Sequence, residues 1–282
     1  MPVVITHLCI YPVKGMHGIA VSEAELTVRG LKFDRTRMVI DESGLFLTQR
    51  NLPKLAVMQV KINGAAVKLE NPDGNSLTLP ENTKGLKKIP VTVWSDTCEA
   101  FDEGDEASDW LTDTLGTHKG RKLRMVRFND EYRRNVDRTH LKGEDSHTAF
   151  ADGFPYLITS ESSLNRLNER LIERGSEPVP MNRFRPNIVI KGLAAFRENR
   201  IDELASASGA YRLGIRKPCK RCKVTTVDQD DGNISDPKEP LRTLTLMNTV
   251  PGLHGAYFGQ NATLLSPEGA VIRVGDDLME TE

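Results

Sequence analysis

The sequence predicts a mainly β fold of the α+β class, and three observations support this prediction. The first third of the chain is dense in β-branched segments that are separated by turn-forming residues. Asn63-Gly64, between two such segments, is the strongest short hairpin signal available. The clearest amphipathic helix starts within residues 159–163 and is ended by Gly175. At 282 residues, the chain is long enough for one large or two medium-sized domains.

The first part of the chain, residues 1–120, is predicted to be a small antiparallel barrel or sandwich. The turns at residues 41–44, 63–64 and 71–75 are short, and short turns join antiparallel strands. A helix is expected at residues 103–116, where the apolar side chains recur at helical spacing before Gly116. The expected strands are 3–10, 38–40, 45–48, 57–62, 66–69, 76–79 and 91–94.

The second part, residues 121–282, is again predicted to be mostly β, with one or two helices packed on it. Residues 129–146 are polar and rich in arginine and show no hydrophobic period, which indicates a loop. The helix that starts within residues 159–163 has one apolar stripe, made of Leu164, Leu167, Leu171 and Ile172. The expected strands are 123–126, 187–190, 211–215, 224–228, 262–265 and 271–276.

Composition narrows the functional class. The net charge of −1 does not mark a nucleic-acid-binding protein. Four cysteines over this length argue against a disulfide scaffold and for a reducing compartment. The N-terminus has no charged leader, and no apolar run is long enough to span a bilayer. We therefore expect a cytoplasmic protein.

The most informative stretch is residues 216–223, where Cys219 and Cys222 lie two residues apart among cations. Neighbouring Arg216, Lys217, Lys220 and Arg221 favour thiolate over thiol. A thiolate of this kind is a soft nucleophile or a metal ligand.

Four interpretations of the cysteine pair are open at this point. A structural zinc site needs four ligands, but Cys9 and Cys98 are isolated and the histidines show no matching spacing. A thioredoxin-type pair should open a helix, whereas a strand is predicted after Cys222. The pair also fits two small, partly buried structural residues. Finally, one thiolate fits a soft transition metal in a cofactor whose negative charge the cations would receive.

Seven short motifs occur in an order that resembles a known family. They are residues 11–15, 33–35, 184–189, 219–222, 225–228, 239–244 and 258–261. Together they resemble the MOSC (molybdenum cofactor sulfurase C-terminal) superfamily, preceded by a MOSC N-terminal β-barrel domain. The chain is similar to the mitochondrial amidoxime-reducing component and its bacterial counterparts, and the resemblance covers nearly all of it. It implies an N-terminal β-barrel-like domain at residues 1–120 and a MOSC β-barrel domain with a few packed helices at residues 121–282.

The resemblance implies a bound molybdenum cofactor, in which a pterin dithiolene holds the metal and ends in a phosphate. Cys222 matches the family's metal-binding and catalytic thiolate, while Cys219 is expected to serve packing or support. The cofactor-binding residues that the resemblance implies are Lys14, Arg35, Arg185, Asn187, Arg221 and Asn261. Thr159 and Ser160 are added to them because they start a helix, where free backbone N–H groups and hydroxyls attract anions.

Each of these residues also has a plainer interpretation. A single arginine commonly forms a surface or interdomain ion pair. Thr159 and Ser160 fit helix N-caps equally well, and Asn261 fits a turn. The chain departs from the family at Gly15 and Lys220, where many relatives have serine. The departure at Lys220 adds a charge beside the predicted site.

The resemblance implies the reduction of small N-hydroxylated substrates, such as amidoximes, hydroxylamines and N-hydroxylated bases, to the amine. The sequence lacks the cysteine cluster of a [2Fe–2S] domain, so we expect electrons from a separate ferredoxin-, flavoprotein- or cytochrome-type donor.

The rival function is a sulfur carrier with Cys222 as a persulfide. The basic run at residues 119–142 lacks the aromatic platform of a nucleic-acid site. Pyridoxal phosphate binding is expected only as a property of the family in general.

Overall fold

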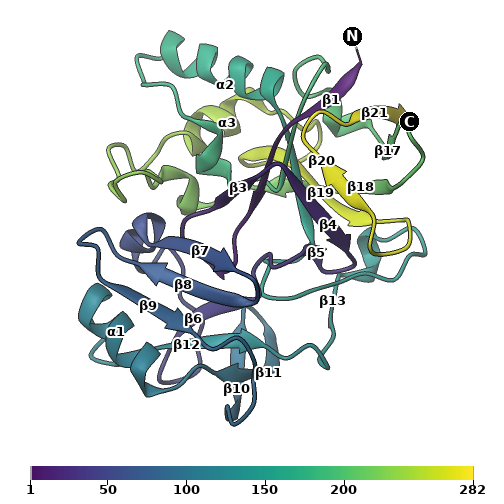
Figure 1. The fold of residues 1–282 in the computed structure, drawn as a ribbon. Coiled ribbons are helices and arrows are strands. Elements are labelled where there is room, and N and C mark those ends of the chain that lie inside the picture. Colours follow the sequence, from purple (N-terminus) through teal and green to yellow (C-terminus); the bar gives the residue numbers. More distant parts are fainter. Residues whose placement is uncertain (1, 282) are drawn as a thin grey trace.

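A closed seven-stranded barrel is the centre of the C-terminal half in the computed structural model, which describes residues 2–281 (Figure 1). Its hydrogen-bonded order is β16-β15-β19-β18-β17-β21-β1, and β1 pairs back with β16 to close the ring. Only the β15–β16 pair is parallel within this ring. The strands are β1 (Val3–Ile10), β15 (Tyr156–Ser160), β16 (Ile188–Lys191), β17 (Glu203–Ser206), β18 (Arg212–Lys220), β19 (Tyr257–Leu264) and β21 (Asp277–Thr281).

The N-terminal part of the structure is built from two sheets and a helix, and it lies beside the barrel (Figure 1). Only the β2–β6 pair is parallel within these two sheets. One sheet has the order β10-β11-β12-β6-β2, and the other has the order β7-β8-β9. These elements are β2 (Val13–Lys14), β6 (Arg37–Asp41), β7 (Gln59–Asn63), β8 (Ala66–Glu70), β9 (Ser76–Leu79), β10 (Lys88–Val93), β11 (Asp96–Asp102), β12 (Leu123–Phe128) and α1 (Asp105–Leu115).

Smaller elements connect and cover these two parts. The short strands are β3 (Ile19–Val21), β4 (Glu23–Thr27), β5 (Gly30–Leu31), β13 (Arg134–Asn135), β14 (His147–Thr148) and β20 (Val271–Arg273). Two further α-helices are α2 (Glu161–Glu173) and α3 (Leu241–Met247), and they contact each other. The 3₁₀ helices are η1 (Pro53–Val57), η2 (Arg138–His140), η3 (Met181–Phe184), η4 (Arg197–Arg200) and η5 (Lys223–Thr226).

The hydrophobic core is divided in the same way as the sheets. One cluster fills the barrel and includes Ile5, Leu8 and Ile190. A second cluster lies under β7, β8 and α1, where Val67 and Leu69 alternate with more exposed residues, as period-two patterning requires. A third cluster packs α2 and α3 against Phe184 and Phe258. The strands and helices of both parts are therefore well packed.

The predicted mainly β fold class is confirmed, and so are its main elements. The Asn63-Gly64 turn joins β7 to β8 in an antiparallel hairpin. The helix predicted before Gly116 is α1, and Gly116 is its C-cap at φ 80°. The strand predicted at residues 3–10 is β1.

Several element predictions are wrong. Residues 224–228 do not form a strand, because Lys223–Thr226 is the 3₁₀ helix η5. The hydroxyls of Thr225 and Thr226 donate to the carbonyls of Cys222 and Lys223, and such local bonds compete with a strand ladder. Ile172 is 61% exposed and lies outside the apolar stripe of α2. The segment 45–48 makes only isolated bridges, and the sequence reasoning missed α3 and β21.

Strand pairing crosses the predicted boundary near residue 120 in both directions. β1 comes from the N-terminal end of the chain but pairs with β16 and β21 in the C-terminal barrel. β12 follows residue 120 but pairs with β11 and β6 in the N-terminal sheet. The division at residues 1–120 and 121–282 therefore stays a prediction, and the two parts share strands across it.

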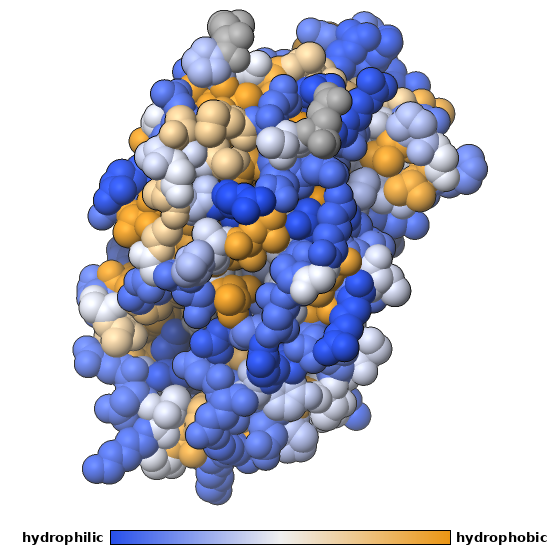
Figure 2. Space-filling view, turned by 90° about the vertical axis from the view of Figure 1, so that its right-hand side faces the viewer, coloured by the Kyte–Doolittle hydropathy of each residue, from blue (hydrophilic) through white to orange (hydrophobic). Residues whose placement is uncertain are grey.

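The face in Figure 2 is largely hydrophilic, with small and separate hydrophobic patches. Scattered apolar residues of this kind are normal on a protein surface. Among residues 2–281, no helix combines the length and apolar character needed to cross a membrane.

Candidate functional site

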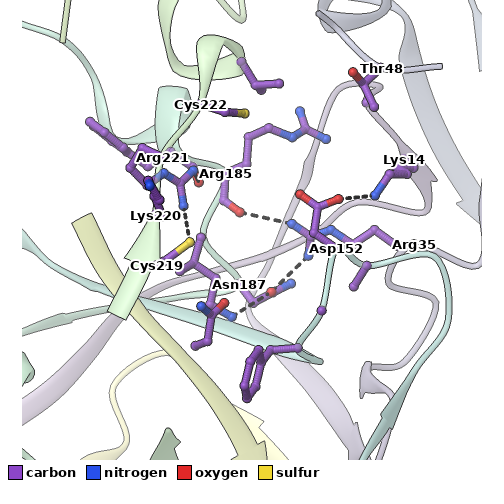
Figure 3. A pocket seen from close by; sticks show the side chains of 18 of the residues that line it. Lys14, Arg35, Thr48, Asp152, Arg185, Asn187, Cys219, Lys220, Arg221 and Cys222 are labelled. Atoms are coloured by element: carbon purple, nitrogen blue, oxygen red, sulfur yellow. Dashed lines mark hydrogen bonds and ion pairs between the residues drawn. The ribbon is translucent and has the colours of Figure 1, made fainter. Parts of the chain in front are cut away.

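A solvent-open cavity lies where segments of the two parts meet. The lining segments are distant in sequence and include Lys14, Arg35, residues 48–50 and 151–154, and the cysteine pair (Figure 3). All predicted site residues except Thr159 and Ser160 line it, namely Lys14, Arg35, Arg185, Asn187, Arg221, Cys222 and Asn261. The fold thus gathers most of the predicted site in one place.

Lys14 is buried at the cavity wall, on the short strand β2, which pairs in parallel with β6. Its ammonium donates to the Phe150 carbonyl at 2.8 Å and forms an ion pair with Asp152. Burial lowers the pKa of Lys14, and the Asp152 carboxylate opposes that shift. Sequence reasoning missed Asp152, because Asp152-Gly153 signals only a turn.

The Asp152 carboxylate remains 69% exposed while it contacts Lys14. Burial acts to raise the pKa of Asp152, but the charge and hydrogen bond of Lys14, and a hydrogen bond from Trp94, hold that pKa well below its usual range. Asp152 is therefore ionised at neutral pH. It is a largely exposed anion on the wall of a mostly cationic cavity.

The guanidinium groups of Arg35 and Arg185 both pack against the Tyr11 ring. Their guanidinium carbons are 4.5 Å and 4.2 Å from the ring centroid. Both arginines have left-handed backbones, with φ of 48° and 53°, which is uncommon outside glycine. The Tyr11 hydroxyl donates to the Pro186 carbonyl at 3.1 Å and fixes the ring. The Tyr11 ring therefore forms a cation–π contact with each of the two guanidinium groups.

Asn187 orients Arg35 from the barrel side. Its side-chain oxygen accepts from Arg35 at 2.9 Å and from the Leu157 amide at 3.2 Å. Its amide nitrogen donates to the Cys9 carbonyl at 3.2 Å. Arg35 also donates to Asp34 at 2.5 Å. The Asn187 amide is thus occupied by protein partners and acts by holding Arg35 in place.

Arg185 is held by a buried amide pair that joins the two parts of the molecule. The guanidinium donates to the Gln229 side chain at 2.9 Å and to the Met16 carbonyl at 2.7 Å. Gln229 and Gln49 exchange amide hydrogen bonds of 3.0 Å and 2.9 Å. Burial lowers the pKa of Arg185 to about 10, so it remains protonated at neutral pH. Neither glutamine was found from the sequence, because a buried Gln pair leaves no local signal.

The cysteine pair lies where β18 ends. The β18–β19 pairing shifts register between Ile215 and Lys217 and again between Pro218 and Lys220, and bulges of this kind re-aim side chains next to functional sites. Cys219 is half-buried, and Cys222 is exposed immediately before η5. The cysteine pair is therefore presented at the end of a bulged strand.

Arg221 contacts the first cysteine of the pair. Its guanidinium donates to the Cys219 sulfur at 2.8 Å and to the Phe184 carbonyl at 2.7 Å (Figure 3). The Arg221 side chain thus supports Cys219. Among the residues that the structure describes, the Cys222 thiol makes no hydrogen bond, and only the Cys222 carbonyl accepts hydrogen bonds, from Thr225. The side chain of Cys222 is left free to meet a ligand in the cavity.

Thr159 and Ser160 do not line the cavity, because both are fully buried in β15. The Thr159 hydroxyl points to the Met181 sulfur at 3.3 Å. Ser160 occupies the N-cap position of α2, but its side chain makes no capping hydrogen bond. Asn261 lies in β19, opposite Leu157 and Lys217, so it belongs to a strand rather than to a turn.

The side chains that line the cavity carry a net positive charge, which favours the binding of anions. Six cationic side chains line it, against the single carboxylate of Asp152, and the cations are Lys14, Arg35, Arg50, Arg185, Lys220 and Arg221. A low-dielectric wall strengthens the field of such a cluster. The arrangement can bind a polyanionic group and present the Cys222 thiol to it.

Two family models match most of the chain. The MOSC N-terminal beta barrel domain matches residues 3–118, and the MOSC domain matches residues 145–279. Mitochondrial amidoxime-reducing component 1 of Homo sapiens is 35% identical over 285 residues, which cover 96% of this chain and 81% of that protein. The same component of Mus musculus is 34% identical over 286 residues, which cover 96% and 80%. Molybdenum cofactor sulfurase of Bos taurus is 30% identical over 245 residues, which are 81% of this chain and 27% of that protein.

Proposed function

The chain belongs to the MOSC family, with both a MOSC N-terminal beta barrel domain and a MOSC domain, and on this premise we propose that it is a molybdenum-cofactor-dependent reductase of N-hydroxylated compounds. The observation that carries the proposal is the position of Cys222. Its exposed thiol lies at a cavity that six cations and one carboxylate line. Relatives at 34–35% identity bear the name amidoxime-reducing component, which supports the reductive reaction class.

The residues at the cavity fit such a cofactor. A thiolate is a soft ligand that suits molybdenum, and Cys222 is the more exposed cysteine of the pair. A terminal phosphate requires cations, which Lys14, Arg35 and Arg185 provide. Arginine offers a planar fork for phosphate or carbonyl oxygens, and lysine offers a point charge.

Each side chain has a distinct task in this proposal. Cys222 would hold the metal, while Lys14, Arg35 and Arg185 would bind the anionic and polar parts of the cofactor. Asn187 and Gln229 position Arg35 and Arg185 through the bonds described above. When bound, the cofactor supplies the two-electron chemistry that removes oxygen from the N–OH group as water and leaves the amine.

Electrons would come from a separate donor protein of the ferredoxin, flavoprotein or cytochrome type. The donor's identity and the cytoplasmic location stay predictions, and pyridoxal phosphate binding stays a family-level expectation. The reaction also needs a proton donor, and Asp228 is one candidate. Asp228 does not line the cavity, however, and its carboxylate pairs with Arg183 at 2.8 Å. Hydrogen bonds from backbone amides, with the charge of Arg183, lower the pKa of Asp228, which makes it a poor proton donor.

The test is metal and pterin content together with activity. Protein expressed with cofactor supply should contain molybdenum and pterin and reduce benzamidoxime when a chemical or enzymatic electron donor is present. Cys222→Ala should lose reduction, whereas Cys98→Ala, in the buried N-terminal core, should keep it. Full activity in Cys222→Ala would refute the proposed role of this residue.

A second candidate is a sulfur carrier with Cys222 as a persulfide. Two observations favour it, namely the exposed thiol and the relative named molybdenum cofactor sulfurase. Cyanide-labile sulfur on Cys222 in protein that lacks pterin would favour the carrier. Stoichiometric molybdenum with pterin would favour the reductase.

A further inference from the structure

Three side chains, Arg50, Trp94 and Phe46, form a cluster at the edge of the cavity, which we call the aromatic rim. The ring centroids of Phe46 and Trp94 are 5.1 Å apart at a tilt of 56°. The Arg50 guanidinium lies 4.3 Å from the centroid of Trp94 and 6.0 Å from that of Phe46. Arg50 itself lines the cavity. None of these residues has a part in the binding of the cofactor proposed above.

Trp94 is held at the rim in an unusual conformation. It is the first residue of the two-residue turn between β10 and β11, where Val93 pairs with Asp96. Its φ is 59°, and such a value is a genuine outlier for a bulky residue. Even so, Trp94 is 44% exposed, so burial of its ring does not explain why it occupies this position. Its indole N–H donates to Asp152 at 3.1 Å, which ties the ring to the cavity wall.

Arg50 carries a charge that no carboxylate compensates. In residues 2–281, no Asp or Glu oxygen forms an ion pair with its guanidinium, although most arginines near the cavity have such a partner or a carbonyl. Its Nε donates to the Thr48 hydroxyl at 3.2 Å, and its plane rests over Trp94. The guanidinium is therefore fixed in orientation and retains donors for an added anion.

Arg50 of the aromatic rim lines the same cavity as Cys222. Residues 48–50 and Cys222 both line it, and Figure 3 draws Thr48 and Cys222 on different sides of the space between them. A small molecule whose reacting group is at Cys222 would extend toward the segment that carries Arg50. Lys14, Arg35 and Arg185 would be engaged by the cofactor, and Lys220 and Arg221 flank the cysteine pair, so Arg50 is the cation that residues 48–50 offer to such a molecule.

We propose that the aromatic rim is a substrate-selecting subsite for planar N-hydroxylated compounds that carry a carboxylate or phosphate group. The rings of Trp94 and Phe46 contact the planar part, and Arg50 binds the anionic group. Neutral substrates gain only the ring contact, and cationic substrates are repelled by Arg50. This inference rests on the proposed function, because it concerns the substrate of the same site.

The first test compares three substrates that differ in charge on the molybdenum-loaded protein. The substrates are 4-carboxybenzamidoxime, benzamidoxime and 4-(aminomethyl)benzamidoxime, and the readout is kcat/KM for each. We expect the anionic compound to be preferred. Arg50→Gln should lower the ratio of the anionic to the neutral substrate by about tenfold, the usual scale of one charge-assisted hydrogen bond. An unchanged ratio in Arg50→Gln would overturn the inference.

Two variants distinguish binding from general structural effects. Arg166→Gln removes an exposed arginine of α2 that pairs with Glu169, and it should leave the substrate ratio unchanged. Arg50→Lys keeps the charge but loses the planar fork, so its ratio should lie between those of the wild type and Arg50→Gln. If Arg50→Gln lowers the midpoint of thermal unfolding and leaves the substrate ratio unchanged, Arg50 only stabilises the fold and the inference fails.

A binding measurement separates this inference from the proposed reaction. The chain has two tryptophans, Trp94 and Trp110, so fluorescence reports on the rim above a background from α1. Titration with 4-carboxybenzamide should quench Trp94 more strongly than titration with benzamide. The difference should vanish in Arg50→Gln, and Trp94→Phe should remove the signal. If no N-hydroxylated compound is reduced, the proposed function fails, while equal quenching by both amides would refute the rim as an anion-selecting site.

Discussion

At the residue scale, the site depends on side chains that hold other side chains. Arg35 and Arg185 are positioned by Asn187, Gln229 and the ring of Tyr11. Both arginines sit in left-handed backbone conformations, which cost free energy and persist only where surrounding contacts over-determine them. The cationic groups are therefore preorganised before any ligand arrives.

Asn187 provides the first prediction. Asn187→Ala leaves the buried Leu157 amide and the Cys9 carbonyl without their side-chain partner. The free energy of unfolding should fall by about 1–3 kcal/mol, as is typical for an unsatisfied buried group. Urea unfolding at 25 °C measures the change, and Asn75→Ala in an exposed turn is the control. Equal effects of the two substitutions would show that the Asn187 network contributes no stability.

The ion pair of Lys14 and Asp152 provides a pH prediction. Against the effect of burial, the charge of Lys14 holds the pKa of Asp152 below its unfolded value, so the unfolded state binds more protons in acid. The stability from this pair is therefore present above about pH 4, the ordinary aspartate value, and is lost as pH falls through the folded pKa.

Comparison of the wild type with Asp152→Asn tests this linkage. The stability difference between the two proteins should be largest near neutral pH and should shrink in acid. Urea unfolding from pH 7 to pH 3 measures it, with Asp73→Asn, at an exposed turn, as a correction for general acid effects. A difference that stays constant over this range would contradict the predicted pairing.

At the element scale, strand β1 closes the barrel. It pairs with β16, β21 and β3, and its apolar side chains point into the barrel core. Because the strand next leads through Tyr11 to β2 and Lys14, closure of the barrel also sets the position of the cationic wall. The bulges in β18 have the same role for the cysteine pair.

Two substitutions in β1 test this role. Leu8 is fully buried, so Leu8→Ala should lower the free energy of unfolding by about 2–5 kcal/mol through lost burial and a residual cavity. His7, the adjacent exposed residue, should tolerate His7→Ala within about 0.5 kcal/mol. Chemical denaturation compares the two variants. Similar losses in both would argue against the barrel-closing role of the strand.

At the scale of the whole molecule, the Gln49–Gln229 pair joins the N-terminal part to the C-terminal part. Both side chains are buried, and each donates to the other. A double-mutant cycle with Gln49→Ala and Gln229→Ala should give a coupling energy of about 0.5–3 kcal/mol. The pair Gln49→Ala and Gln59→Ala, with Gln59 exposed in β7, should be additive. Additivity in both cycles would mean that the amide pair does not couple the two parts.

Much of the local structure was predictable from the sequence. The Asn63-Gly64 hairpin, helix α1 with Gly116, and strand β1 follow from turn chemistry and side-chain periodicity, which act over a few residues. The run at residues 224–228 was mispredicted because β-branched residues favour strands, while the threonine hydroxyls in this segment bond to nearby carbonyls. Ser160 was assigned to the cofactor from its position at a helix start, but it is the last residue of β15, where its side chain is buried.

The sequence alone determined the types of chemistry available to this protein, because the thiols of the pair, the cations and the turn residues are visible in short segments. The tertiary structure decided which of them share a cavity. Asp152, Tyr11, Gln49 and Gln229 acquire their roles only through contacts with residues far away in the chain. Burial, register and long-range pairing depend on how the barrel closes, and no local pattern encodes them.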